Sequence, residues 1–141
     1  MKVIYTILIF LLSTTSFGYI NIYPMEFDKN ISNGVTESFK LYNRTSNEIR
    51  YRVYIEKSKE KDMSQWIEIY PQSISLKPLE EKELRLSVTP PKNAQAGEYK
   101  AKLVIKEIKV PNKKDNKKIN IMTLFKLNMK GCIEEKNELT K

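Results

Sequence analysis

The chain has 141 residues, which is enough for one domain but short for two. It carries 25 Lys and Arg against 17 Asp and Glu, a formal net charge of +8, and it contains no histidine. Without histidine the chain lacks the commonest general base and metal ligand, and a Ser-His-Asp triad is excluded. Cys132 is the only cysteine, so no disulfide can form within the chain and the fold must depend on its hydrophobic core.

Residues 1–18 have the pattern of a secretory signal peptide. Lys2 supplies the positive charge, residues 3–12 are almost entirely apolar, and small residues lead up to Gly18. A retained membrane anchor is the alternative, but the apolar run is about half the length that a bilayer span requires. We therefore expect cleavage near Gly18 and a periplasmic or secreted protein. The positive net charge could suit a nucleic acid, but an exported location argues against nucleic acid as the protein's binding partner.

The first strands are predicted by short runs in which apolar residues alternate with polar ones. Residues 19–28 alternate around Pro24, which indicates an edge strand or a kink where the chain changes sheets. A tight turn at Asn33-Gly34 leads to a strand over 35–43. The clearest strand in the chain is predicted over 48–56, and the charged residues 57–63 form a loop after it.

Four further strands are predicted in the middle of the chain, at 66–70, around Ile74 and Leu76, at 82–88 and from Tyr99 to Ile105. Trp66 is expected to cover one end of the core. Tyr99 is expected to form a tyrosine corner, in which the hydroxyl binds backbone upstream; ordinary packing in the core is the alternative.

The last predicted strand, over 119–133, is apolar on both faces. Its odd positions carry Ile119, Ile121 and Phe125, and its even positions add Met122 and Leu124. Such a strand is either central and buried or an edge strand that awaits a partner. Within this run, the ammonium of Lys126 either reaches solvent or holds the carboxylate of a partner.

Together these seven to eight strands predict an all-β fold, an immunoglobulin-like β-sandwich over residues 19–133 with no disulfide. A polar C-terminal tail follows over 134–141. The sequence shows no catalytic motif, no phosphate-binding loop and no metal-ligand spacing. The acids Glu80-Glu81 are interpreted as solvated charge, and the sequons at Asn30 and Asn43 matter only in a glycosylating pathway. We therefore expect a binding protein rather than an enzyme, with no cofactor and no metal.

Several segments resemble the N-terminal domain of periplasmic pilus-assembly (PapD-like) chaperones. They are the signal segment, residues 39–43 (FKLYN), residues 71–78 (PQSISLKP), residues 84–86 (LRL) and residues 125–127 (FKL). The resemblance covers nearly all of residues 19–133. It implies that the last strand lends alternate apolar residues to an incomplete pilin fold, while a basic pair anchors the pilin's C-terminal carboxylate. On this resemblance the partner strand binds Ile119, Ile121, Thr123 and Phe125, and Lys126 is the carboxylate anchor.

The chain departs from that family in two places. Glu26 stands where the first strand of the family carries an arginine, and a carboxylate there repels another carboxylate. The second sandwich domain of the family has no counterpart in these residues. Either a partner supplies a second chaperone-like domain in trans, or the chain keeps the fold and has a different role. We expect an exported, chaperone-like protein that captures a fimbrial or surface subunit, such as a pilin or adhesin, by strand addition. The alternative is a structural or accessory immunoglobulin-like subunit of a cell-surface assembly.

Overall fold

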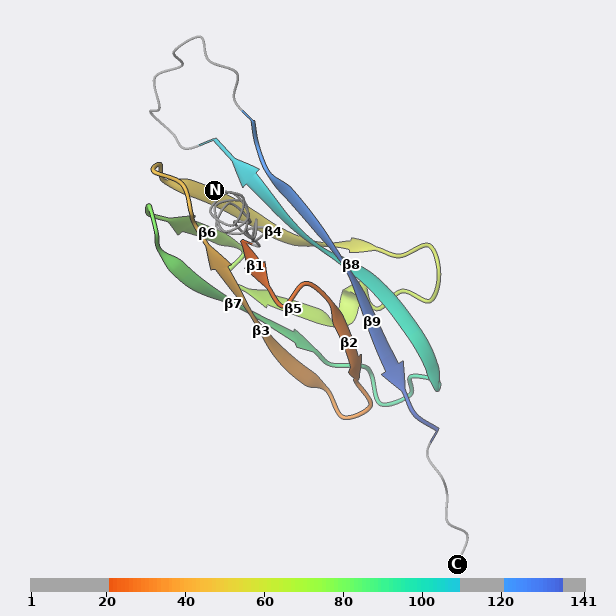
Figure 1. The fold of residues 1–141 in the computed structure, drawn as a ribbon. Coiled ribbons are helices and arrows are strands. Elements are labelled where there is room, and N and C mark those ends of the chain that lie inside the picture. Colours follow the sequence, from red (N-terminus) through yellow and green to blue (C-terminus); the bar gives the residue numbers. More distant parts are fainter. Residues whose placement is uncertain (1–20, 110–120, 136–141) are drawn as a thin grey trace, which may run out of the picture.

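The computed structural model describes residues 21–109 and 121–135. The predicted signal peptide, residues 110–120 with Ile119 among them, and the end of the polar tail lie outside these residues. Two β-sheets pack face to face (Figure 1). The elements in chain order are β1 (Ile22–Tyr23), β2 (Phe27–Asn30), β3 (Val35–Tyr42), β4 (Ile49–Lys57), the 3-10 turn η1 (Ser64–Trp66), β5 (Ile67–Tyr70), β6 (Ser73–Leu76), β7 (Glu81–Val88), β8 (Gly97–Ile108) and β9 (Leu124–Ile133).

The topology confirms the predicted all-β, immunoglobulin-like sandwich. One sheet has four strands in the order β1-β3-β7-β5, and the other has five in the order β2-β9-β8-β4-β6. Neighbouring strands are antiparallel except β2, which runs parallel to β9. The described residues form one strand more than the sequence predicted, because the run at 19–28 is divided into β1 and β2. Within these ranges no helix is long and apolar enough to cross a membrane.

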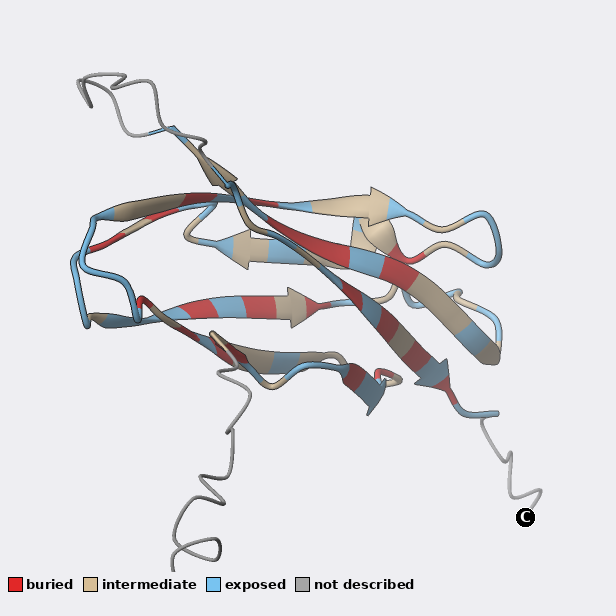
Figure 2. Cartoon of the chain, turned by 45° about the horizontal axis from the view of Figure 1, so that its top comes forward, coloured by how far each residue is buried: buried red, intermediate tan, exposed pale blue. Residues whose placement is uncertain are grey.

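The core lies between the two sheets, where the alternating apolar faces of the strands meet. Figure 2 shows the buried residues as bands along the strands, separated by exposed ones. Phe39, Leu84 and Leu103 are completely buried in this layer. Burying side chains of this size contributes about 1.5–3 kcal/mol each. The sandwich therefore closes by packing alone, with Cys132 an exposed free thiol.

On each lateral side of the sandwich, one strand leaves one sheet and continues in the other. β1 pairs with β3, whereas β2 pairs with β9 across the sandwich, and Pro24 lies between them. In the same way β5 pairs with β7, β6 pairs with β4, and Pro71 lies between. Both Tyr-Pro peptide bonds are cis. Because proline has no N–H for a ladder, it suits the crossing point, and the predicted change of sheets at Pro24 is confirmed.

Tyr99 forms the predicted tyrosine corner at one end of the core. Its hydroxyl donates a hydrogen bond of 2.9 Å to the carbonyl oxygen of Gln95, four residues upstream. Its ring centroid lies 4.6 Å from that of Trp66, in a tilted arrangement. Trp66 is half-buried against the core, so the two aromatic rings together cover this end, as expected from the sequence.

Asn43 is the one polar side chain that is fully buried among the described residues, at 1% exposure. Its amide nitrogen lies 2.7 Å from the Asn47 carbonyl and 3.0 Å from the carbonyls of Leu76 and Lys77. Its amide oxygen accepts from the backbone and hydroxyl of Thr45. The side chain thereby ties the β3–β4 loop to the β6–β7 turn. Because the amide nitrogen is buried and bonded, the sequon at Asn43 is not an acceptor site in the folded protein.

We predict that Asn43→Asp destabilises the fold by about 3 kcal/mol or more, because a buried carboxylate would face carbonyl oxygens where an amide now donates. Urea unfolding followed by Trp66 fluorescence measures the loss. Asn47→Asp is the matched control, since the side chain of Asn47 is exposed and only its backbone takes part. Equal stability of the two variants would contradict this account of the network.

Candidate functional site

The second half of β9 is part of the protein's own core. Leu127, Met129, Gly131 and Ile133 face inward and are buried. A Cβ on Gly131 would come within 2.6 Å of Ile31 and 2.9 Å of the Met63 sulfur, so the strand is tightly enclosed at this level. The final strand is therefore anchored firmly through its C-terminal half.

The first half of β9 has a neighbour on one side only. β8 pairs with all of β9, but β2 pairs only with Met129–Cys132. Beside residues 124–128, the part of the chain that the structure describes places no strand on the outer side. The short β2, cut off by the crossing at Pro24, thus leaves an open sheet edge.

The hydrogen-bond pattern tells which backbone groups face this open edge. The N–H of Glu107 on β8 donates to the carbonyl of Thr123 over 2.8 Å. Since pairing alternates along an antiparallel ladder, the odd residues of β9 bind β8 and the even ones point away. Farther along, the Cys132 carbonyl accepts from the N–H of Ile31, on the outer side. The N–H and C=O groups of Leu124 and Lys126 therefore face the open edge, as does the N–H of Asn128, whereas the pairing of Phe27 with Met129 uses the Asn128 carbonyl.

Exposed apolar side chains precede and accompany this edge. Ile121 is 87% exposed, Met122 46% and Leu124 50%. Tyr23 and Met25, at the point where the first strand changes sheets, are also largely exposed. The segment at 121–124 therefore carries apolar surface that the core of the monomer does not use.

The residues predicted from the sequence divide between this surface and the core. Ile121 is exposed, whereas Thr123 is half-buried and its N–H binds the Glu107 carboxylate at 2.8 Å. Phe125 faces inward and packs 6.3 Å from the ring of Tyr51, ring centroid to ring centroid. Ile119 lies outside the described residues. The sequence identifies Met122 and Leu124 only as additional apolar residues, and it assigns the odd-numbered row to the partner strand.

Lys126 already holds a carboxylate from its own chain. Its Nζ lies 3.0 Å and 3.1 Å from the two carboxylate oxygens of Glu56 on β4. Both side chains are partly exposed on the outer face of the five-stranded sheet. Among the described residues no ion pair joins Lys126 to Glu26, which lies exposed in the β1–β2 connection. Sequence spacing gave no sign of Glu56, because 70 positions separate it from Lys126.

No group of three His, Cys, Asp or Glu side chains within the described ranges could hold a metal ion. The arrangement on β9 offers instead main-chain donors and acceptors, apolar side chains and one ammonium group. Those are the elements of a strand-pairing site.

Comparisons with known proteins identify relatives by fold. No protein family model matches the chain, and no curated protein matches it. The periplasmic chaperone SfaE is similar in structure, with a TM-score of 0.64 and 11% identity over 81% of this chain and 57% of that chain. A chain of the CsuC–CsuE chaperone–tip adhesion subunit pre-assembly complex of Acinetobacter baumannii gives 0.61 and 16%, over 85% of this chain and 60% of that one.

A third similar structure is SSP-19, an MSP-domain protein like family member of Caenorhabditis elegans. Its TM-score is 0.59 at 14% identity, and the match covers 80% of this chain and 99% of that chain. The chain thus spans somewhat over half the length of the two pilus-chaperone chains and nearly all of SSP-19. At these identities the comparisons establish the fold, and in fold they confirm the resemblance to PapD-like pilus chaperones.

We predict a small, salt-dependent coupling between Lys126 and Glu56. A double-mutant cycle with Lys126→Ala and Glu56→Gln should give about 0.2–1 kcal/mol at low salt, because partly exposed ion pairs are screened by solvent. Urea unfolding at low and high salt measures the coupling, which should shrink as salt rises. A coupling that salt leaves unchanged would assign the contact to packing of the side-chain stems.

Tyr51, beneath Phe125, should make the fold sensitive to alkali. Burial, and secondarily the Glu107 carboxylate, raises the pKa of Tyr51 from 10.0 to about 12. Between these values the unfolded chain loses the phenol proton while the folded protein keeps it, so the unfolded state binds fewer protons and stability falls as pH rises. Tyr51→Phe should remove this loss, about 1 kcal/mol by pH 11. If the free energies of unfolding of the wild type and of Tyr51→Phe changed in parallel with pH, Tyr51 would make no contribution to this loss.

Proposed function

We propose that the protein is an exported, chaperone-like binding protein that captures a surface or fimbrial subunit by β-strand addition at the open edge of β9. The observation that carries the proposal is the outer backbone of Leu124 and Lys126, which no described strand pairs, with exposed apolar residues leading into it. In strand addition, main-chain hydrogen bonds supply affinity and alternate side chains supply specificity. The fold shared with SfaE and the CsuC–CsuE chain supports the same reading.

In this proposal the two ends of β9 have different tasks. The buried half, from Leu127 to Ile133, holds the strand in the sandwich, while the half before it remains available to the partner. Ile121 belongs to the inserted row together with Ile119 and Thr123, and Leu124 adds an apolar side chain on the outer face. Phe125 supports the edge from inside through Tyr51 rather than entering the partner.

Lys126 binds the partner's carboxylate by exchange rather than by simple addition. In the free protein the ammonium of Lys126 donates to both carboxylate oxygens of Glu56. An incoming carboxylate gains a charge-assisted bond but displaces an existing one, so its net contribution is small. With Glu26 in place of a second cation, affinity at this edge rests mainly on backbone pairing and apolar contact. The same proposal includes export to the periplasm or the cell exterior and a second chaperone-like domain supplied in trans.

The central experiment is co-expression with exported surface subunits of the same organism, followed by co-purification. We predict that Ile121→Asp and Leu124→Asp reduce subunit recovery by about tenfold or more, because a desolvated carboxylate opposes insertion into an apolar groove. Circular dichroism and thermal unfolding should be unchanged, since both side chains are exposed. Leu79→Asp, in the turn between β6 and β7, is the matched control, because its side chain is 68% exposed and belongs to neither β9 nor the groove between β4 and β5. Normal recovery with both β9 variants would refute strand addition at this edge.

The role of Lys126 is tested by ionic strength. Lys126→Ala should weaken subunit capture more at low salt than at high salt, because salt already erodes an exposed charge contact. Glu56→Gln should have the opposite effect, since it releases the ammonium for the partner. Capture measured across a salt series with both variants distinguishes this from a packing role, for which the loss in Lys126→Ala would not depend on salt.

The second candidate function is a structural or accessory subunit of a surface assembly. The observation that favours it is the packing of Phe125 against the monomer's own core, beside Tyr51. Isolated surface assemblies separate the two functions. A subunit remains in the purified assembly in fixed proportion, whereas a capturing protein is found with the subunit only before assembly.

A further inference from the structure

The opposite side of the sandwich carries a second open region, between β4 and β5. β6 pairs only with residues 49–52 of β4, and β5 is the outermost strand of the four-stranded sheet. Between them lies a groove of about 1100 Å³, which residues 52–55 and 67–70 line along its length. Gln72 and Ser73 also line it, where the chain crosses between the sheets. β4 and β8 separate this groove from the edge of β9.

Both walls of the groove present backbone groups that the fold leaves unpaired. On β4, the N–H of Val53 donates to the Gln72 carbonyl over 2.9 Å, so by alternation the backbone of Ile55 also faces the groove. Directly before β5, the Trp66 carbonyl accepts from the N–H of Thr89, directly after β7, over 2.8 Å. By alternation the backbone of Ile67 and Ile69 on β5 faces the groove. Within residues 21–109 and 121–135, no second strand reaches these groups.

The floor of the groove is apolar. The side chains of Ile55, Ile67 and Ile69 are partly buried and pack against the edge of the core. Tyr70, at the rim, is 79% exposed although its ring is large. A strand laid along β5 would cover this floor and would place alternate side chains over Ile55 and Ile69.

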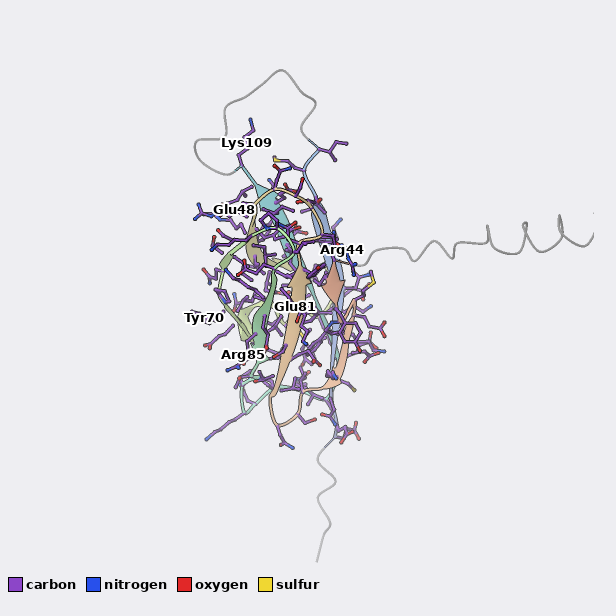
Figure 3. All side chains as sticks on the ribbon, turned by 60° about the vertical axis from the view of Figure 1, so that its left-hand side comes forward. Arg44, Glu48, Tyr70, Glu81, Arg85 and Lys109 are labelled. Atoms are coloured by element: carbon purple, nitrogen blue, oxygen red, sulfur yellow. The ribbon has the colours of Figure 1, made fainter. Side chains whose placement is uncertain are left out.

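Positively charged side chains at the rim of the groove determine which kind of partner segment fits it. Arg52 and Arg85 line the groove and are exposed, and neither forms an ion pair with any described residue. Arg85 is the cross-strand neighbour of Tyr70, and Figure 3 shows the two side chains at the same margin of the molecule. Guanidinium groups match carboxylates in geometry and charge. Since the chain itself carries a net charge of +8, a second copy is a poor occupant and an acidic partner a good one.

We propose that this groove binds an extended, acidic segment of a partner protein. The segment pairs with β5 through its backbone, places apolar side chains over Ile55 and Ile69, and directs carboxylates toward Arg52 and Arg85. This site is distinct from the edge of β9, so the protein would hold two extended segments on opposite sides of one sandwich.

Labelled synthetic peptides test the proposal with the purified protein. The probe is a short peptide of alternating valine and threonine with aspartate at both ends. One matched peptide carries asparagine at the ends, and another is N-methylated at alternate residues so that it cannot pair with a strand edge. Fluorescence anisotropy should show saturable binding of the aspartate peptide only. Binding should weaken about tenfold in Arg52→Gln or Arg85→Gln and remain unchanged in Lys92→Gln, a remote exposed cation.

Amide hydrogen exchange locates the bound peptide. New protection at Ile55, Ile67 and Ile69 supports the proposal. Protection at Leu124, Lys126 and Asn128 instead would overturn it while leaving strand addition at β9 intact. Equal binding of the asparagine or N-methylated peptide would also overturn the proposal. Sedimentation experiments test for a second copy as the occupant: self-association of the protein that Arg85→Gln abolishes would overturn the proposal too.

Discussion

Each lateral side of the sandwich is closed by one strand that serves both sheets. At Pro24 and at Pro71 the chain leaves one sheet and enters the other, so each sheet receives only half a strand on that side. The neighbouring longer strands, β9 and β4, are therefore paired along part of their length and open along the rest. The missing N–H of proline makes these crossings compatible with the hydrogen-bond pattern, and both open edges follow from them.

The two open edges differ in chemistry although they share an origin. At β9 the exposed residues are mostly apolar, and the nearby cation is already bound to Glu56. At the groove between β4 and β5, isoleucines line the apolar floor, and the arginines at the rim form no ion pair with any residue that the structure describes. Exposed strand edges favour pairing with further strands. The proposed binding of extended segments at the two edges rests on this property.

Much of this architecture follows from local sequence. The period-2 runs, the prolines and the turn at Asn33-Gly34 located the strands because alternation and turn chemistry act over a few neighbouring residues. Tyr99 was recognisable as a corner because its bond to Gln95 closes within the same segment. The pairing of Lys126 with Glu56 and the burial of Asn43 depend on residues far away in the chain, and neither could be predicted from spacing.

The sequence by itself determined an all-β sandwich without covalent links, and it identified the final segment as more apolar than a terminal strand requires. Only the tertiary structure decided which of those apolar residues remain outside. The physical reason is that the inward or outward direction of a strand residue follows from pairing register, and register is set by neighbouring strands. The pairing with β8 turns Phe125 toward Tyr51 and leaves Leu124 at the surface. Because β2 is short, no described strand pairs with the outer backbone of Leu124 and Lys126.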